Sequence, residues 1–135
     1  MSAGQDKKDV WTRLISEGKL GALAFMRNIR NFEQAGVSRS IIRKGFDSIN
    51  PRWLLPLNYL SAAKYAPNWE REIEALMLRG FIKAPKLPGY TIFVVDVSGS
   101  MGGMISRKSD FNRLDAASAM ALIASETCEH VSIYA

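Results

Sequence analysis

The chain has 135 residues, 47% hydrophobic and 23% charged, which is the composition of a folded globular protein rather than a disordered one. Its one cysteine, Cys128, and one histidine, His130, exclude a disulfide framework, a Cys/His zinc cluster and a Ser/His/Asp triad carried within the chain. No apolar signal segment and no membrane-spanning stretch is visible, so we expect a cytoplasmic protein with no membrane partner.

Charge divides the sequence into two unlike pieces. Residues 1–86 hold 15 Lys and Arg against 8 Asp and Glu, a net charge of +7, whereas residues 87–135 hold 3 against 5, a net charge of −2. A basic piece favours polyanions such as nucleic acid, although basic surfaces also serve solubility alone.

The basic piece has the apolar periodicity of α-helices. Apolar residues recur at three-to-four spacing in five segments, residues 6–18, 19–36, 39–49, 56–65 and 68–80. Gly18, Gly36 and Gly80 are predicted to end helices, and Ser38 and Asn68 to begin them as N-caps. Short helices joined by brief turns predict antiparallel helical pairs of the HEAT or armadillo kind, although no repeat of fixed period is found.

Basic side chains cluster on two of these predicted helices. They are Arg27, Arg30, Arg39, Arg43 and Lys44. One interpretation is a solvated helix face, and the other is a ridge that contacts phosphates. We carry these five residues forward as candidates for RNA binding.

A second kind of pattern begins after a proline- and glycine-rich linker at residues 85–90. Residues 92–95 form an apolar run typical of a strand covered on both faces. An alanine-rich helix at 114–128 and a strand at 131–135 follow. Strand, helix and strand together predict one unit of a parallel α/β sheet.

Three oxygen donors follow the first of these strands. Asp96 ends the apolar run, and Ser98 and Ser100 follow at two-residue spacing. Ligands of open α/β sheets collect at the carboxyl ends of strands. Carboxylate and hydroxyl oxygens suit Mg²⁺, Mn²⁺ or Ca²⁺ rather than zinc. We therefore predict a divalent metal site at these residues, with Mg²⁺ as the first candidate.

Two other interpretations of the same loop stay open. The serines could simply cap backbone amides. Alternatively, Asp96 could be a phosphorylated nucleophile, as in the haloacid dehalogenase family. That family has the pattern DxDxT, and Ser98 stands where its second aspartate is needed.

Two levels of resemblance narrow the function. DVSGS resembles the DxSxS first motif of the metal-ion-dependent adhesion site (MIDAS) in von Willebrand factor A domains. VWTRLISEGKLGALAFMRNIRNFEQAGV, PLNYLSAAKYAPNWE and TIFVVDVSGSM, in that order, resemble the end of the TROVE helical-repeat domain running into its A-type domain, as in the Ro ribonucleoprotein autoantigen family. The similarity extends from about Asp9 to Ala135.

The resemblance implies an α-helical, HEAT-like segment over residues 1–84 and the start of an incomplete α/β, Rossmann-like von Willebrand factor A domain over 91–135. It implies that Asp96, Ser98 and Ser100 are metal ligands and that the remaining ligands, a threonine and an aspartate, lie beyond Ala135. We accordingly expect the chain to carry only part of that domain.

The function implied by the resemblance is binding rather than catalysis. Ro-type proteins bind small noncoding Y RNAs and the single-stranded ends of defective RNA, and bacterial members work with an exoribonuclease. The implied partners are therefore a small noncoding RNA and an exoribonuclease or other protein held through the metal site. The alternative is an adhesion or scaffold module that uses the metal to grip an acidic residue of a protein partner.

Overall fold

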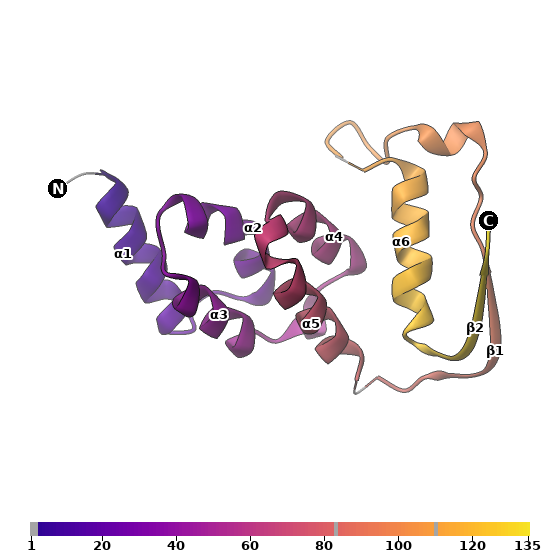
Figure 1. Ribbon diagram of the computed structural model, residues 1–135, viewed down its shortest axis with the longest axis horizontal. Coiled ribbons are helices and arrows are strands. Elements are labelled where there is room, and N and C mark those ends of the chain that lie inside the picture. The colour runs from indigo at the N-terminus through magenta and orange to yellow at the C-terminus, as the bar shows by residue number, and fades with distance from the viewer. Residues whose placement is uncertain (1–2, 83, 110) are drawn as a thin grey trace. The chain divides into compact units, whose positions relative to one another are not determined.

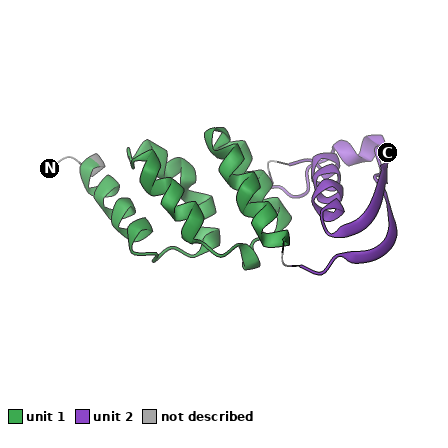
Figure 2. Cartoon of the chain, turned by 60° about the horizontal axis from the view of Figure 1, so that its bottom comes forward, with its two compact units in different colours: residues 1–82 green, residues 83–135 purple. Residues whose placement is uncertain are grey.

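The computed structural model describes residues 3–82, 84–109 and 111–135. The chain forms two compact units, residues 1–82 and 83–135, shown in different colours in Figure 2. The first unit is helical, and the second contains a small parallel sheet and one longer helix (Figure 1). This confirms the predicted succession of a helical segment and a partial α/β unit. None of the described helices is both long and apolar enough to cross a membrane.

The first unit is an array of helices that matches the five predicted segments. Its elements are α1 (Ala3–Ser16), α2 (Ala22–Gln34), α3 (Arg39–Ser48), the short 3₁₀ helix η1 (Pro51–Trp53), α4 (Pro56–Tyr65), the short 3₁₀ helix η2 (Pro67–Trp69) and α5 (Glu70–Phe81). Prolines begin η1, α4 and η2, where a missing backbone N–H costs nothing.

Glycines end α1 and α2 as predicted. Gly18 and Gly36 have φ angles of 64° and 79°, a region that glycine enters without a Cβ penalty. After α2, the backbone N–H of Gly36 donates to the carbonyl of Glu33 and that of Val37 donates to the carbonyl of Phe32, at 3.0 Å each. This pair of bonds is a Schellman motif, which satisfies carbonyls that the helix leaves unpaired.

Two predicted helix ends need correction. Asn68 is not an N-cap, because η2 intervenes and α5 begins after Trp69. Gly80 does not end α5, which continues to Phe81. Ser38 is the N-cap residue of α3 as predicted, although its hydroxyl lies 3.2 Å from that of Ser40 and makes no capping bond to the helix.

The helices of the first unit form two layers. α3 packs against both α1 and α5, which gives an odd-numbered layer, and α2 packs against α4, which gives an even-numbered layer (Figure 1). α3 and α5 run parallel, because Arg39 early in α3 bonds to Asn68 and Arg79 late in α5 bonds to Phe46. Two such layers are the arrangement predicted for antiparallel helical pairs.

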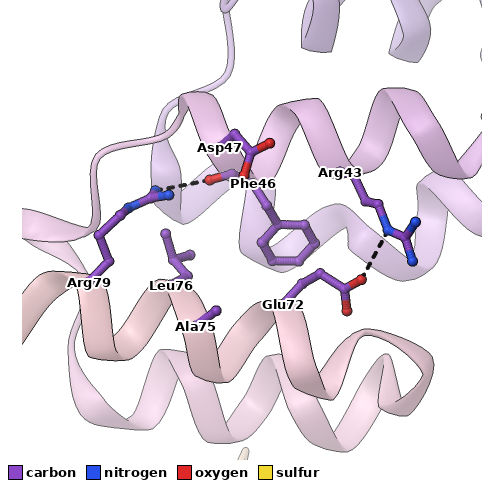
Figure 3. Close-up of a pocket in the computed structure, with 7 residues that line it drawn as sticks. All are labelled: Arg43, Phe46, Asp47, Glu72, Ala75, Leu76 and Arg79. Atoms are coloured by element: carbon purple, nitrogen blue, oxygen red, sulfur yellow. Dashed lines mark hydrogen bonds and ion pairs between the residues drawn. The ribbon is translucent and has the colours of Figure 1, made fainter.

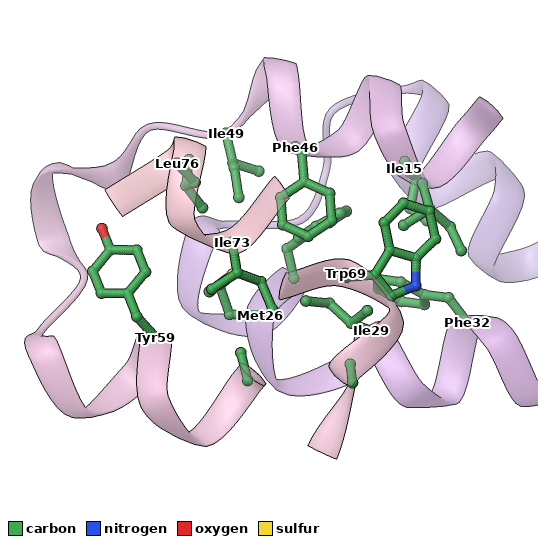
Figure 4. Close-up of a cluster of buried hydrophobic side chains, with 14 of the residues drawn as sticks. Ile15, Met26, Ile29, Phe32, Phe46, Ile49, Tyr59, Trp69, Ile73 and Leu76 are labelled. Carbon is green, nitrogen blue, oxygen red and sulfur yellow. The ribbon is translucent and has the colours of Figure 1, made fainter. Parts of the chain in front are cut away.

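A continuous apolar core lies between the two layers (Figure 4). The largest side chains that are almost completely buried are Trp69, Phe25, Phe32, Ile29, Ile42 and Leu76. Phe25 contacts both Phe32 and Phe46, with ring centroids 5.3 and 5.0 Å apart. Each buried side chain of this size contributes roughly 1.5–3 kcal/mol relative to exposure, so this core carries the stability of the unit.

The second unit is a strand–helix–strand unit, as predicted. Its elements are β1 (Leu87–Val94), the short 3₁₀ helix η3 (Gly99–Gly102), α6 (Arg113–Ser125) and β2 (Cys128–Tyr134). β1 and β2 pair in parallel, with Phe93 opposite Ile133. β1 begins at Leu87, inside the stretch predicted as a linker, and the pairing shifts by one residue near Gly89, whose φ is 81°.

The two faces of this sheet differ in burial. Phe93 is half-buried and Val95 buried on the face toward α6, whereas Ile92 and Val94 are 60% and 77% exposed on the other. The prediction of a strand covered on both faces is therefore wrong for the described residues. The apolar run forms the strand, but the main contact of this sheet is the one between α6 and β2, and a single helix covers a single face.

Gly45 in α3 is a point where three helices approach closely. A Cβ added there would overlap the ring of Phe25 and lie 3.0 Å from Cγ2 of Ile15. Gly45→Ala should therefore destabilise the chain by about 1–2 kcal/mol. Overpacking costs roughly 1–3 kcal/mol, and the higher helix propensity of alanine offsets up to about 1 kcal/mol of that cost. Urea unfolding followed by tryptophan fluorescence measures the change.

Gly80→Ala is the matched control. A Cβ at Gly80 would meet Pro51 at 3.4 Å, an ordinary contact, and Gly80 lies inside α5. This variant should be neutral or up to about 1 kcal/mol more stable. Equal destabilisation by both variants would contradict the close packing around Gly45.

Candidate functional site

An exposed carboxylate, that of Asp96, lies just beyond the end of β1. Val95 is buried, and its backbone N–H still donates to the carbonyl of Tyr134, at 2.8 Å. Asp96 follows at once and is exposed. The pairing with β2 therefore holds the backbone in place up to Val95. Asp96 and the residues after it form a loop outside the sheet.

The loop brings Asp96, Ser98 and Ser100 together. Oδ1 of Asp96 accepts a hydrogen bond from the backbone N–H of Ser98, at 2.8 Å, and the hydroxyls of Ser98 and Ser100 lie 3.1 Å apart. The backbone bond from Ser98, and then its side-chain bond, hold the pKa of the Asp96 carboxyl below its ordinary value. The carboxylate is consequently charged at neutral pH.

This donor set fits part of the coordination shell of a hard cation. One carboxylate and two hydroxyls face a common region and are open to solvent. No group of three His, Cys, Asp or Glu side chains suited to a metal occurs among residues 3–82, 84–109 and 111–135. A cation held at Asp96 would therefore need further ligands. The guanidinium of Arg113 donates to the carbonyl of Ser100 at 3.4 Å, and its positive charge opposes a cation nearby.

In the helical unit, two of the predicted RNA-binding arginines already have partners on α5 and the turn before it. The guanidinium of Arg39 lies 4.3 Å from the ring centre of Trp69 and donates to the carbonyl of Asn68 at 3.0 Å. Arg43 forms an ion pair with Glu72, at 3.2 Å. These contacts join α3 to α5, so both arginines have a structural role in addition to any role in RNA binding.

A small pocket lies between α3 and α5 (Figure 3). Its volume is about 290 Å³. The Arg43–Glu72 pair borders it, and Arg79 donates at the other end to the carbonyls of Phe46 and Ile49, at 3.0 and 2.8 Å. These bonds satisfy carbonyls at the end of α3. Arg43, Glu72 and Arg79 are therefore engaged in structural contacts, and Asp47 is the remaining ionisable side chain that lines the pocket.

The remaining predicted arginines lie in the other layer. Arg27 and Arg30 are exposed on α2, in the even-numbered layer, whereas Arg39, Arg43 and Lys44 are exposed on α3, in the odd-numbered layer. The structure thus divides the predicted set of five between two layers and does not gather it into one ridge.

Sequence reasoning missed a basic and aromatic pair on η1. Trp53 is 77% exposed, and the guanidinium of Arg52 lies over its ring, 5.0 Å from the centre. The sequence did contain a signal, because no Asp or Glu occurs between Asp47 and Glu70. A tryptophan beside an arginine in an acid-free stretch is typical of nucleic-acid contacts.

Comparison with known proteins gives one match. The family model described as TROVE domain matches residues 1–72, which form most of the helical unit and end within α5. No curated protein and no solved structure matches the chain significantly. The match confirms the TROVE resemblance of the first piece, and the von Willebrand factor A resemblance of the second piece stays a prediction. With more than half of its residues matched by this model, the chain belongs to the TROVE domain family.

Proposed function

We propose that this chain is the RNA-binding part of a Ro-type ribonucleoprotein, which binds a small noncoding, Y-like RNA and misfolded RNA in RNA quality control. The observation that carries the proposal is the TROVE match over residues 1–72, since membership of this family implies an RNA partner in general. The chain binds rather than catalyses, and it does so in the cytoplasm.

The charge of the helical piece supports this proposal. Residues 1–86 carry a net charge of +7, and phosphate neutralisation by such a surface supplies most non-specific affinity for nucleic acid. Arg27 and Arg30 are the strongest candidates for phosphate contacts, because they are exposed on α2. Arg39, Arg43 and Lys44 supply a second basic group on α3, where Glu72 neutralises part of the charge.

The Asp96 loop supports a second activity in the other unit. We propose a MIDAS-type site in which Asp96, Ser98 and Ser100 hold Mg²⁺, or Mn²⁺ or Ca²⁺ in its place. When bound, the cation would supply an open coordination position for a carboxylate of an exoribonuclease or another protein. The chain's own residues provide one charge and two hydroxyls, and the loop hydrogen bonds keep them together.

The same loop supports the alternative function, a metal-dependent adhesion or scaffold module without RNA. Salt and chelation separate the two. RNA binding should fall steeply as ionic strength rises, whereas metal-dependent capture of a carboxylate should be lost on chelation.

The RNA proposal is tested by the double variant Arg27→Ala/Arg30→Ala. We expect its affinity for a small structured RNA to fall and the slope of log affinity against log salt to decrease by about one unit for each phosphate contact removed. Fluorescence anisotropy at several salt concentrations measures both quantities. Arg107→Ala/Lys108→Ala is the matched control, since it also removes two exposed positive charges, but from the second unit.

An equal loss of affinity in the two double variants would mean that overall charge explains the effect and that α2 has no specific role in RNA binding.

Arg39→Ala is a separate prediction, about stability. It removes the cation above Trp69 and a hydrogen bond to Asn68, so its free energy of unfolding should fall by about 1 kcal/mol whether or not RNA is present.

The metal proposal is tested by Asp96→Asn. Calorimetric titration of the chain with Mn²⁺ should show binding in the millimolar range, and this variant should abolish it, because Asp96 is the one charged donor of the trio. Glu126→Gln, which removes an exposed carboxylate just after α6, should leave the titration unchanged. Identical titrations of the Asp96→Asn variant and the unaltered chain would refute the site.

A further inference from the structure

Trp53 is exposed, whereas the other two tryptophans of the chain pack against neighbouring side chains. Trp69 is 1% exposed, and Trp11 lies edge-on to Phe32 with ring centroids 5.1 Å apart. Trp53 is 77% exposed on η1. Leaving so large an apolar ring in water forgoes about 1.5–3 kcal/mol of burial, and nothing in the packing of the first unit requires it there.

The backbone that carries Trp53 is held in place. Asn50 accepts a hydrogen bond from the backbone N–H of Arg52, at 3.0 Å, and the N–H of Leu54 donates to the carbonyl of Pro51, at 2.9 Å. Pro51 also fixes its own φ and lies against Gly80 of α5. The indole is thus presented from a fixed turn, which reduces the conformational entropy lost when a ligand binds it.

Arg52 supplies a charge on the same turn. Its guanidinium lies over one part of the indole, 5.0 Å from the ring centre, and the high exposure of Trp53 leaves the rest of the ring open. A planar cation beside an open aromatic ring can neutralise a phosphate while the ring stacks on a base.

The surroundings are depleted of negative charge. The sequence has no acid between Asp47 and Glu70, and η1 packs against α2, which carries Arg27 and Arg30. η1 also packs against α5, where Pro51 lies beside Gly80, next to Arg79 in the last turn, whereas the acids Glu70 and Glu72 lie in the first turn at the other end of that helix. The one acid of α2, Glu33, is engaged by Trp69, whose Nε1 donates a hydrogen bond to it at 2.8 Å. The charge around Trp53 favours a polyanion.

We infer that Trp53 is a stacking platform for a base of single-stranded RNA, with Arg52 contacting the adjacent phosphate. The inference rests on the proposed RNA-binding function and assigns it a specific contact. Stacking needs an unpaired base, because bases within a duplex already stack on each other. This contact therefore selects single-stranded segments, whereas phosphate contacts by arginines alone do not.

The test compares two probes of about ten nucleotides, a site size typical of single-stranded RNA binding. One is single-stranded RNA, and the other is an abasic ribose-phosphate strand of equal length. Trp53→Ala should weaken binding of the RNA about tenfold and leave binding of the abasic strand unchanged. Trp53→Phe should retain most of the affinity, since it keeps an aromatic ring.

Intrinsic fluorescence gives a second readout. Stacking of a base on Trp53 should quench part of the tryptophan emission, and the quenching should vanish in Trp53→Phe, because Trp69 is buried and Trp11 packs against Phe32. Tyr90→Ala, which removes an exposed aromatic ring from β1, is the control and should bind RNA normally. Urea unfolding should show that Trp53→Ala folds as the unaltered chain does.

Two results overturn the inference. Equal affinities of Trp53→Ala and the unaltered chain for the RNA would exclude stacking, and equal losses for both probes would show that the effect of Trp53 does not depend on the bases. If the chain still bound structured RNA through Arg27 and Arg30, the proposed function would survive either result. Failure of the unaltered chain to bind RNA in either form would overturn the proposed function as well.

Discussion

Trp69 joins the helices on which the first unit depends. Its ring stacks on Phe46 of α3, with centroids 5.7 Å apart, its Nε1 donates to Glu33 of α2, and the guanidinium of Arg39 lies over the ring. A single side chain at the start of α5 thus contacts both layers. Burial of the indole is favourable because its one polar atom has a partner.

The same contacts determine how charge is displayed. By donating to Glu33, Trp69 holds in place the one carboxylate of the helix that carries Arg27 and Arg30. By stacking with Arg39, it holds one cation of α3 in place. The core and the basic surface are therefore not independent features. A change in the packing of Trp69 would alter both layers, because it would release an acid in one and a base in the other.

The positions of the helices could be predicted from the sequence, because local signals determine them. Gly18 and Gly36 ended helices as expected, since few other residues tolerate their φ angles. The membership of each layer could not be predicted, because periodicity says which face of a helix is apolar but not which helix it meets. For the same reason, four arginines and a lysine that were close in sequence proved to belong to two layers, and the exposure of Trp53 was not apparent. In the second unit, the two-residue spacing of Asp96, Ser98 and Ser100 predicted their proximity, whereas the approach of Arg113 depends on tertiary structure.

The parallel course of α3 and α5 has an electrostatic consequence. Parallel neighbours place helix macrodipoles side by side with like ends together, which is unfavourable, whereas antiparallel neighbours attract. Two residues of α5 offset this cost. Glu72 lies in its first turn, near the positive ends, and Arg79 binds the last carbonyls of α3, at the negative ends. The polar contacts between α3 and α5 therefore do more than join two side chains. They also reduce the electrostatic cost of a layer in which neighbouring helices run parallel.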